Sequence, residues 1–184
     1  MTSGPKNRRS IAERREQRAA VDDPAVVLAA AARFLEVRPR SVVEVRRRLT
    51  GAGYRAALVD GAIERLLELG MLDDRAFAEA WIASRDRARP RGERVIRQEL
   101  MQKGIDRALI DELLEERRTG DEGQATEPDV HAARRLIERN ARSLARVADP
   151  RQRRARAYAL LARHGFDPDV CREVAAEVVG PESR

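Results

Sequence analysis

The sequence predicts an all-α protein built from three tandem three-helix repeats, and three observations support this fold class. Apolar residues recur at helical spacing in almost every segment, and no segment shows the sustained alternation of a β-strand. The pattern Leu-x-x-x-Gly followed by an apolar residue occurs four times, and three of its copies belong to a longer ungapped repeat. Because one such unit buries little apolar surface by itself, we expect neighbouring repeats to pack into an elongated, curved array.

The chain divides into five segments. Residues 1–20 contain six lysines and arginines against two glutamates, too polar a stretch to offset its ordering entropy, so we expect a disordered basic tail. Helical repeat 1 is expected at 21–72, repeat 2 at 73–118 and repeat 3 at 128–180. The intervening residues 119–127 form a Gly-containing acidic linker.

Local signals mark where the helices begin and end. Each repeat opens with a helix, expected at about 24–36, 74–87 and 128–145. Asp-Pro pairs start three helices, because Asp caps free amides and proline at the first helical position loses no needed donor. The Leu-x-x-x-Gly patterns end four helices, since glycine adopts the left-handed conformation and the next apolar residue folds back onto the leucine. Their glycines are Gly53, Gly70, Gly104 and Gly165.

The ungapped repeat aligns "VRRRLTGAGYRAALVDGAI", "IRQELMQKGIDRALIDELL" and "AYALLARHGFDPDVCREVA". In this alignment Cys171 takes the place of Val59 and Ile110, which predicts a small, buried apolar residue. Two further sets of residues correspond, Leu58 with Leu109 and Val170, and Ala62 with Leu113 and Val174.

Composition points to a reducing compartment and an acidic partner. The net charge is +6, from 37 basic and 31 acidic side chains, which suits contact with a polyanion or an acidic protein face. A single cysteine allows no internal disulfide. The first residues lack the apolar core of a signal peptide, and no apolar run approaches the roughly 20 residues needed to span a bilayer. We therefore expect a cytoplasmic protein without a membrane partner.

Catalysis is not expected, and neither a metal nor a cofactor is predicted. The two histidines, His131 and His164, lie far apart and outside any metal-ligand spacing. The pair Asp73-Asp74 suggests a nuclease as one alternative, but no third carboxylate accompanies it in a recognisable spacing. Both carboxylates fall at a helix start, where the dipole and free amides favour them.

Arginine clusters are the most prominent candidates for binding. They occur in "VRRR" (45–48), "SRDRARPRGERVIRQE" (84–99) and "RVADPRQRRARA" (146–157). The arginine fork makes paired bonds to phosphate or carboxylate, although a solvated charged face is the alternative for any single arginine. Just before the second cluster, Phe77 and Trp81 are expected to anchor the core between the first two repeats, with Arg85 at its rim.

Four segments together resemble the RecX family of regulators of the bacterial recombinase RecA. They are "RSVVEVRRRLTGAGY", "ERLLELGMLDDRAFAEAWIASR", "RGERVIRQELMQKGI" and "ARAYALLARHGF". The resemblance covers about residues 25–179 and is most specific in "LDDRAFAEAWIASR" with the "RG" and "QELMQKGI" that follow. Residues at matching motif positions are Asp73, Asp74, Phe77, Ala78, Arg85, Gly92, Leu100, Lys103 and Gly104.

The resemblance implies a regulatory protein that binds the RecA filament, and we expect this protein to be a monomer. It implies inhibition of RecA ATPase, strand exchange and filament growth, in recombination, DNA repair and the SOS response, and possible contact with single- or double-stranded DNA. No small-molecule substrate is implied. The residues predicted to contact RecA or DNA are Arg46, Arg47, Arg85, Arg91, Arg94, Arg97, Lys103, Arg151, Arg153 and Arg154. The alternative is a helical DNA-binding protein that acts without RecA, whose affinity would fall steeply with salt.

Overall fold

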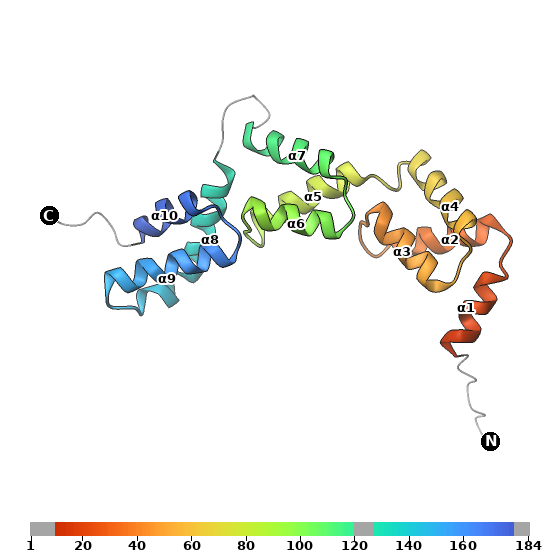
Figure 1. Ribbon diagram of the computed structural model, residues 1–184, viewed down its shortest axis with the longest axis horizontal. Coiled ribbons are helices and arrows are strands. Elements are labelled where there is room, and N and C mark those ends of the chain that lie inside the picture. Colours follow the sequence, from red (N-terminus) through yellow and green to blue (C-terminus); the bar gives the residue numbers. More distant parts are fainter. Residues whose placement is uncertain (1–9, 120–126, 179–184) are drawn as a thin grey trace, which may run out of the picture. The chain divides into compact units, whose positions relative to one another are not determined.

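The computed structural model describes residues 10–119 and 127–178, which form ten helices and no strand (Figure 1). The predicted all-α class is therefore confirmed. The helices are α1 (Ile11–Ala19), α2 (Pro24–Leu35), α3 (Val42–Ala52), α4 (Ala56–Glu68), α5 (Asp74–Arg87), α6 (Glu93–Gln102), α7 (Arg107–Thr119), α8 (Pro128–Ala145), α9 (Pro150–Arg163) and α10 (Pro168–Glu177). Within these described ranges, no helix has the length and apolar character needed to cross a membrane.

The chain divides into two compact units, residues 1–77 and 78–184. The first unit contains repeat 1, in which α2, α3 and α4 enclose a core of Val27, Val45, Val59, Ile63 and Leu66. The boundary between the units falls within α5, and the second unit contains the remainder of α5, α6 and α7 of repeat 2 and all of repeat 3 (α8–α10). The elongated, curved shape expected for the whole array stays a prediction.

Residues 11–19 differ from the disordered tail expected at 1–20. They form helix α1, which begins with a capping box: Ser10 Oγ accepts from Glu13 N at 3.1 Å, and Glu13 accepts from Ser10 N at 2.7 Å. The polar composition predicted disorder because this segment has no apolar face to bury. The structure shows instead that α1 packs against another helix, α3. Residues 1–9 lie outside the described residues, as do 120–126 of the expected acidic linker; Thr119 ends α7.

All four predicted helix ends are confirmed. Gly53, Gly70, Gly104 and Gly165 have φ of 107°, 66°, 81° and 83°. In each case the amide after the glycine donates to the carbonyl of the predicted leucine, at 2.9–3.4 Å, as for Met71 N to Leu66 O at 2.9 Å. One detail differs, because Met71 is 49% exposed and the next residue, Leu72, is buried in its place.

Burial confirms the alignment of the three repeats. Val59, Ile110 and Cys171, predicted to be equivalent, are each 0% exposed. Cys171 is thus a core residue of repeat 3, where it packs with Val130, Leu136, Leu161 and Phe166. The second equivalent set, Ala62, Leu113 and Val174, is 4%, 3% and 1% exposed. A surface feature found in one repeat can therefore be compared position by position with the other two.

Candidate functional site

An ion pair occupies equivalent positions in the first two repeats. Arg46 of α3 pairs with Asp60 of α4, and Arg97 of α6 pairs with Asp111 of α7. The hydrogen bond to Asp111 raises the pKa of Arg97, and Glu93 supports it from the preceding helical turn. Two of the predicted contact residues, Arg46 and Arg97, thus have acidic partners inside their own repeats.

Repeat 3 departs from this pattern. Its residues at the two equivalent positions are Tyr158 of α9 and Arg172 of α10. The acid of the first two repeats is therefore replaced by a base, Arg172. Among the described residues, Arg172 forms an ion pair with Asp169 one turn earlier in its own helix and donates to Pro168 O at 3.3 Å. Such an exposed pair within one helix contributes little stability. Arg151 and Arg154, the arginines on the side of α9 that faces Arg172, therefore remain available to bind an acidic partner.

A groove of about 400 Å³ lies between α9 and α10 at this position. It is lined by Arg151, Arg154, Tyr158 and Arg172, with Ala155 and Ala175 as its small residues. Tyr158 is 37% exposed and is the one aromatic ring of this groove. Three arginines around an exposed ring make a surface suited to an anionic group with an apolar neighbour.

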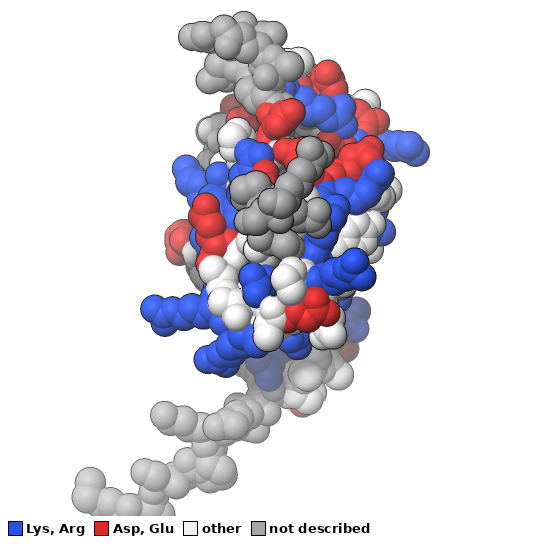
Figure 2. Space-filling view, turned by 90° about the vertical axis from the view of Figure 1, so that its left-hand side faces the viewer, with Lys and Arg blue, Asp and Glu red and all other residues white. Residues whose placement is uncertain are grey.

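Figure 2 shows the face of the second unit on which these helices lie. Acidic and basic side chains are interleaved over its upper part, whereas basic and uncharged side chains predominate toward its lower part, where α9 lies in Figure 1. Arg153 has a different role from Arg151 and Arg154. Its Nε donates to Val147 O at 3.0 Å and its Nη2 to Ala148 O at 3.3 Å, which fixes the loop that joins α8 to α9.

Helix α6 presents a second basic surface. Arg94 is exposed and Arg91 is half-buried, and within the ranges 10–119 and 127–178 neither has a hydrogen bond or ion pair through its side chain. Arg94 also lines a shallow hollow of about 460 Å³ with Gln98 and Met101, whose side chain is 52% exposed. Arg94 therefore combines charge with an exposed apolar neighbour, and Arg91 precedes the same helix.

The predicted residues Arg85 and Lys103 lie in a cluster around Trp81. The Arg85 guanidinium is 4.4 Å from the centre of the Trp81 ring and the Lys103 ammonium is 5.0 Å from it. Glu99 of α6 accepts hydrogen bonds from Trp81 Nε1 at 2.8 Å and from Arg85 Nε at 2.6 Å. The Arg85 side chain is only 13% exposed. This cluster joins α5 to α6 within repeat 2. Phe77 is buried, as expected for a core residue. Packing of Trp81 against repeat 1 stays a prediction.

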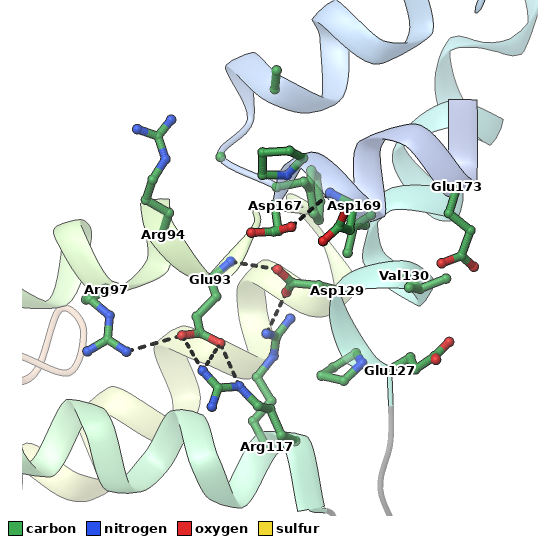
Figure 3. A pocket seen from close by; sticks show the side chains of 17 residues that line it. Glu93, Arg94, Arg97, Arg117, Glu127, Asp129, Val130, Asp167, Asp169 and Glu173 are labelled. Carbon is green, nitrogen blue, oxygen red and sulfur yellow. Dashed lines mark hydrogen bonds and ion pairs between the residues drawn. The ribbon is translucent and has the colours of Figure 1, made fainter. Parts of the chain in front are cut away.

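Repeats 2 and 3 are joined through Arg117, whose side chain is 7% exposed. It donates twice to Asp86 of α5, at 2.7 and 3.1 Å, and once to Asp129 of α8, at 2.7 Å. Burial lowers the pKa of Arg117, but hydrogen bonds to Asp86 and the charges of both carboxylates outweigh it, so the pKa is raised. Asp129 also accepts from the Glu93 amide at 3.0 Å (Figure 3).

An open pocket of about 840 Å³ lies at this junction. Val130, Phe166 and Val170 supply its apolar surface, and Figure 3 shows Glu93 and Asp129 between α6 and α8 with Arg94 extending away from them. Glu93 is held by Arg97 and Arg118, at 3.2 and 2.7 Å. The charges at the centre of the junction are thus neutralised within the protein.

Two glycines let repeats 2 and 3 approach closely. The Gly92 amide donates to His164 O at 3.0 Å, and a Cβ on Gly92 would lie 2.2 Å from Gly165 O. A Cβ on Gly165, whose φ is +83°, would lie 2.3 Å from Val95 Cγ2. His164 ends α9, with its ring Nδ1 2.9 Å from Leu160 O. Gly92 is one of the motif positions named in the family resemblance. This close backbone contact gives a physical reason for a glycine at that position.

The acidic pair has structural roles. Asp73 accepts from Ala76 N at 3.0 Å within the first turn of α5. Asp74 accepts from Val42 N at 2.9 Å and so joins α5 to the start of α3; burial raises the pKa of Asp74. Among the residues that the structure describes, no three His, Cys, Asp or Glu side chains gather as metal ligands. Burial also raises the pKa of the Cys171 thiol.

Sequence reasoning missed five arginine or tyrosine side chains on candidate surfaces. They are Tyr158 and Arg172 in repeat 3 and Arg14, Arg15 and Arg18 in α1. The first two could have been found in the repeat alignment, where they replace the arginine and aspartate of repeats 1 and 2. The α1 arginines carry no such signal, because their position depends on how α1 packs against α3. Of the predicted residues, Arg47 is exposed and faces this helix.

Comparison with known proteins identifies all three repeats. Residues 28–66, 73–114 and 127–175 match the first, second and third three-helix domains of RecX. The regulatory protein RecX of Chlorobium phaeobacteroides (strain BS1) is 32% identical over 149 residues, which span 80% of this chain and 90% of that protein. That of Chlorobaculum tepidum is 33% identical over 153 residues, 83% of this chain and 88% of that protein. The crystal structure of RecX from Lactobacillus salivarius shares the fold, with a TM-score of 0.71 at 22% identity over 85% of this chain and 97% of that one.

Proposed function

Because the chain belongs to the RecX family of regulatory proteins, we propose that it regulates the recombinase RecA by binding the filament that RecA forms on DNA. Binding inhibits RecA ATPase, strand exchange and filament growth in the cytoplasm, and so acts in recombination, DNA repair and the SOS response. The protein catalyses no reaction itself and contributes only a binding surface.

The observation that supports this proposal most is the change of the repeat's ion pair in repeat 3. Repeats 1 and 2 neutralise the arginine at this position with an aspartate, whereas repeat 3 has Tyr158 and Arg172. Arginines left without an acid between α9 and α10 repel one another, which lowers stability. A partner with an acidic face or phosphates would neutralise their charge. An exposed tyrosine adds the apolar area typical of an interface anchor.

The predicted contact residues therefore fall into two groups. Arg91, Arg94, Arg151 and Arg154, together with Arg47, are proposed to contact the filament directly. The second group has partners inside the protein and is proposed to hold the surface in place; it comprises Arg46, Arg85, Arg97, Lys103 and Arg153. Long-range attraction by the first group would speed association, with the effect weakening as salt screens it.

The test is RecA ATPase on single-stranded DNA with this protein titrated in below one copy per RecA, at low and high salt. We expect strong inhibition at substoichiometric ratios. Charge reversal by Arg151→Glu with Arg154→Glu should raise the half-inhibitory concentration by at least about tenfold, and Arg91→Glu with Arg94→Glu should act similarly. Circular dichroism verifies that each variant is folded.

The matched control is Arg65→Glu with Arg107→Glu, which reverses two exposed arginines on α4 and α7 that are not among the residues lining either surface. It should shift the half-inhibitory concentration by no more than about twofold. Equal loss in the control and the test variants would mean that net charge alone acts. No inhibition by the folded wild-type protein would remove the proposed function, and inhibition only at saturation of the DNA would indicate competition for the strand.

A further inference from the structure

A groove of about 380 Å³ lies between α1 and the end of α3. Five arginines line it, three from α1 and two from α3, with Gly51 and Ala52 between them. They are Arg14, Arg15, Arg18, Arg47 and Arg48. Helix α1 precedes residue 28, where the match to the first RecX domain begins. One wall of the groove, α1, therefore lies outside the matched three-helix domain, and the other wall, α3, lies inside it.

Helix α1 is held against α3 by specific contacts. The Arg18 guanidinium donates to Ala52 O at 3.3 Å and lies 5.8 Å from the centre of the Tyr54 ring. At Gly53, a Cβ would lie 2.7 Å from Arg15 O and 2.9 Å from Arg15 Cα. Gly53 thus serves both the left-handed end of α3 and the close approach of α1. The three α1 arginines are fixed at a defined position along α3.

The groove carries positive charge without a matching acid. No aspartate or glutamate is among the described residues that line it. Within residues 10–119 and 127–178, the side chains of Arg15 and Arg47 have no hydrogen bond or ion pair, and Arg48 lies 5.6 Å from the Phe34 ring centre. The like charges of Arg15 and Arg47, together with that of Arg48, repel one another, which is unfavourable unless an anion neutralises them.

Gly51 lines the floor of the groove. It lies in helix α3, where glycine is about 1 kcal/mol less favourable than alanine. Its φ is not in the left-handed region, and a Cβ would meet no atom within 4 Å. The missing side chain leaves the groove floor open, so a ligand could approach the helix backbone there.

From the charge, the concave shape and the open floor, we propose that the α1–α3 groove binds the sugar-phosphate backbone of a nucleic-acid strand. Guanidinium groups on both walls would make paired hydrogen bonds to successive phosphates. No aromatic ring is among the described residues that line the groove, so the bases would not stack on them and binding would be independent of sequence. Helix α1 has nine residues, about 14 Å, which matches a few phosphates of one strand.

An acidic peptide is the competing occupant, and the groove is poorly suited to it. Peptide-binding grooves add main-chain hydrogen bonds or pockets for apolar side chains to their charge contacts. Both walls here are helices whose interior amides are already bonded, and the apolar lining is confined to Ile11 and Ala52. A ligand that is bound only through the spacing of its charges fits this groove better than a peptide does. The proposal requires no recombinase and so stands apart from filament regulation.

The experiment measures binding of the full-length protein, without RecA, to a fluorescein-labelled single-stranded oligonucleotide by anisotropy across a salt series. Arg15→Glu with Arg47→Glu should weaken binding at least about tenfold and reduce the slope of log affinity against log salt by about two. The control Arg65→Glu with Arg107→Glu makes the same change in net charge outside the groove and should change affinity by at most about twofold. Equal weakening by both pairs would overturn the proposal.

A second pair of variants tests the groove without changing charge. Gly51→Gln places a side chain on the groove floor, whereas Gly61→Gln adds the same side chain on α4, where a Cβ also meets no atom within 4 Å. Both should gain helix propensity, and only Gly51→Gln should weaken oligonucleotide binding, by about fivefold or more. Unchanged binding by Gly51→Gln, or tighter binding of a poly-glutamate peptide than of the oligonucleotide, would overturn the assignment to nucleic acid.

Discussion

The junction of repeats 2 and 3 and the α1–α3 groove both concentrate arginines but use them in opposite ways. At the junction, Arg117 is nearly buried and bonded to two aspartates. In the groove, Arg15 and Arg47 have no such partner among the described residues. The difference shows that an arginine cluster in sequence has no fixed meaning. Its role depends on whether folding brings a carboxylate to each guanidinium, and those left without one become candidates for binding.

The strongest test of this comparison is Arg117→Ala. The change leaves Asp86 and Asp129, which are 24% and 18% exposed, without their cation. We expect the free energy of unfolding of the second unit to fall by about 3–5 kcal/mol. Urea denaturation followed through the fluorescence of Trp81, the single tryptophan, measures it. Arg107→Ala, at a position 82% exposed, is the control and should stay within about 0.5 kcal/mol. A loss below about 1 kcal/mol for Arg117→Ala would contradict a stabilising role.

The next largest effect is expected at the glycine contact of the same junction. Gly92→Ala forces a methyl group to within 2.2 Å of Gly165 O, so the two repeats must separate. The free energy of unfolding should fall by about 2–3 kcal/mol, measured in the same urea titration. Gly61→Ala is the matched control, because its methyl group enters open space and should add up to about 1 kcal/mol. If both variants were equally stable, the close approach would not be needed.

The smallest effect is expected in the groove. Arg47→Ala removes one of several like charges and breaks no described ion pair, so the free energy of unfolding should change by no more than about 0.5 kcal/mol. Any change should be toward greater stability, because repulsion among the arginines falls. Thermal unfolding by circular dichroism at low salt detects it. Destabilisation by more than about 1 kcal/mol would mean that Arg47 supports the fold, and the contrast with Arg117 would disappear.

Much of the fold could be predicted because its signals are local or repeated. The stop at Gly104 depends on residues within one turn, and Leu100, Gly104 and Ile105 are all visible in the sequence. The equivalence of Val59, Ile110 and Cys171 followed from an ungapped alignment and was confirmed by their burial. Helix α1 was missed because its nine residues are polar, and the contact that holds it is with α3.

Sequence spacing did not reveal which of the predicted contact arginines have acidic partners inside the protein. Arg85 looked like a rim residue by its helical spacing, but Glu99 of the next helix accepts its hydrogen bond. Arg97 looked free beside Arg94, but Asp111 of another helix is its partner. In each case the deciding carboxylate is 14 residues away. Sequence spacing does not predict such arginine–carboxylate pairs, because the relative placement of two helices decides whether their side chains meet.

The sequence by itself determined the all-α class, the helix ends and the repeat register, because hydrogen bonds within a turn and burial of an apolar stripe depend on nearby residues. Only the tertiary structure decided which charges are neutralised. Arg117 reaches Asp86 and Asp129 across three helices, while Arg15 of α1 and Arg47 of α3 line one groove and have no acidic partner among the described residues. Charge pairing requires side chains to come within a few ångströms, and that distance is set by the packing of helices far apart in the chain.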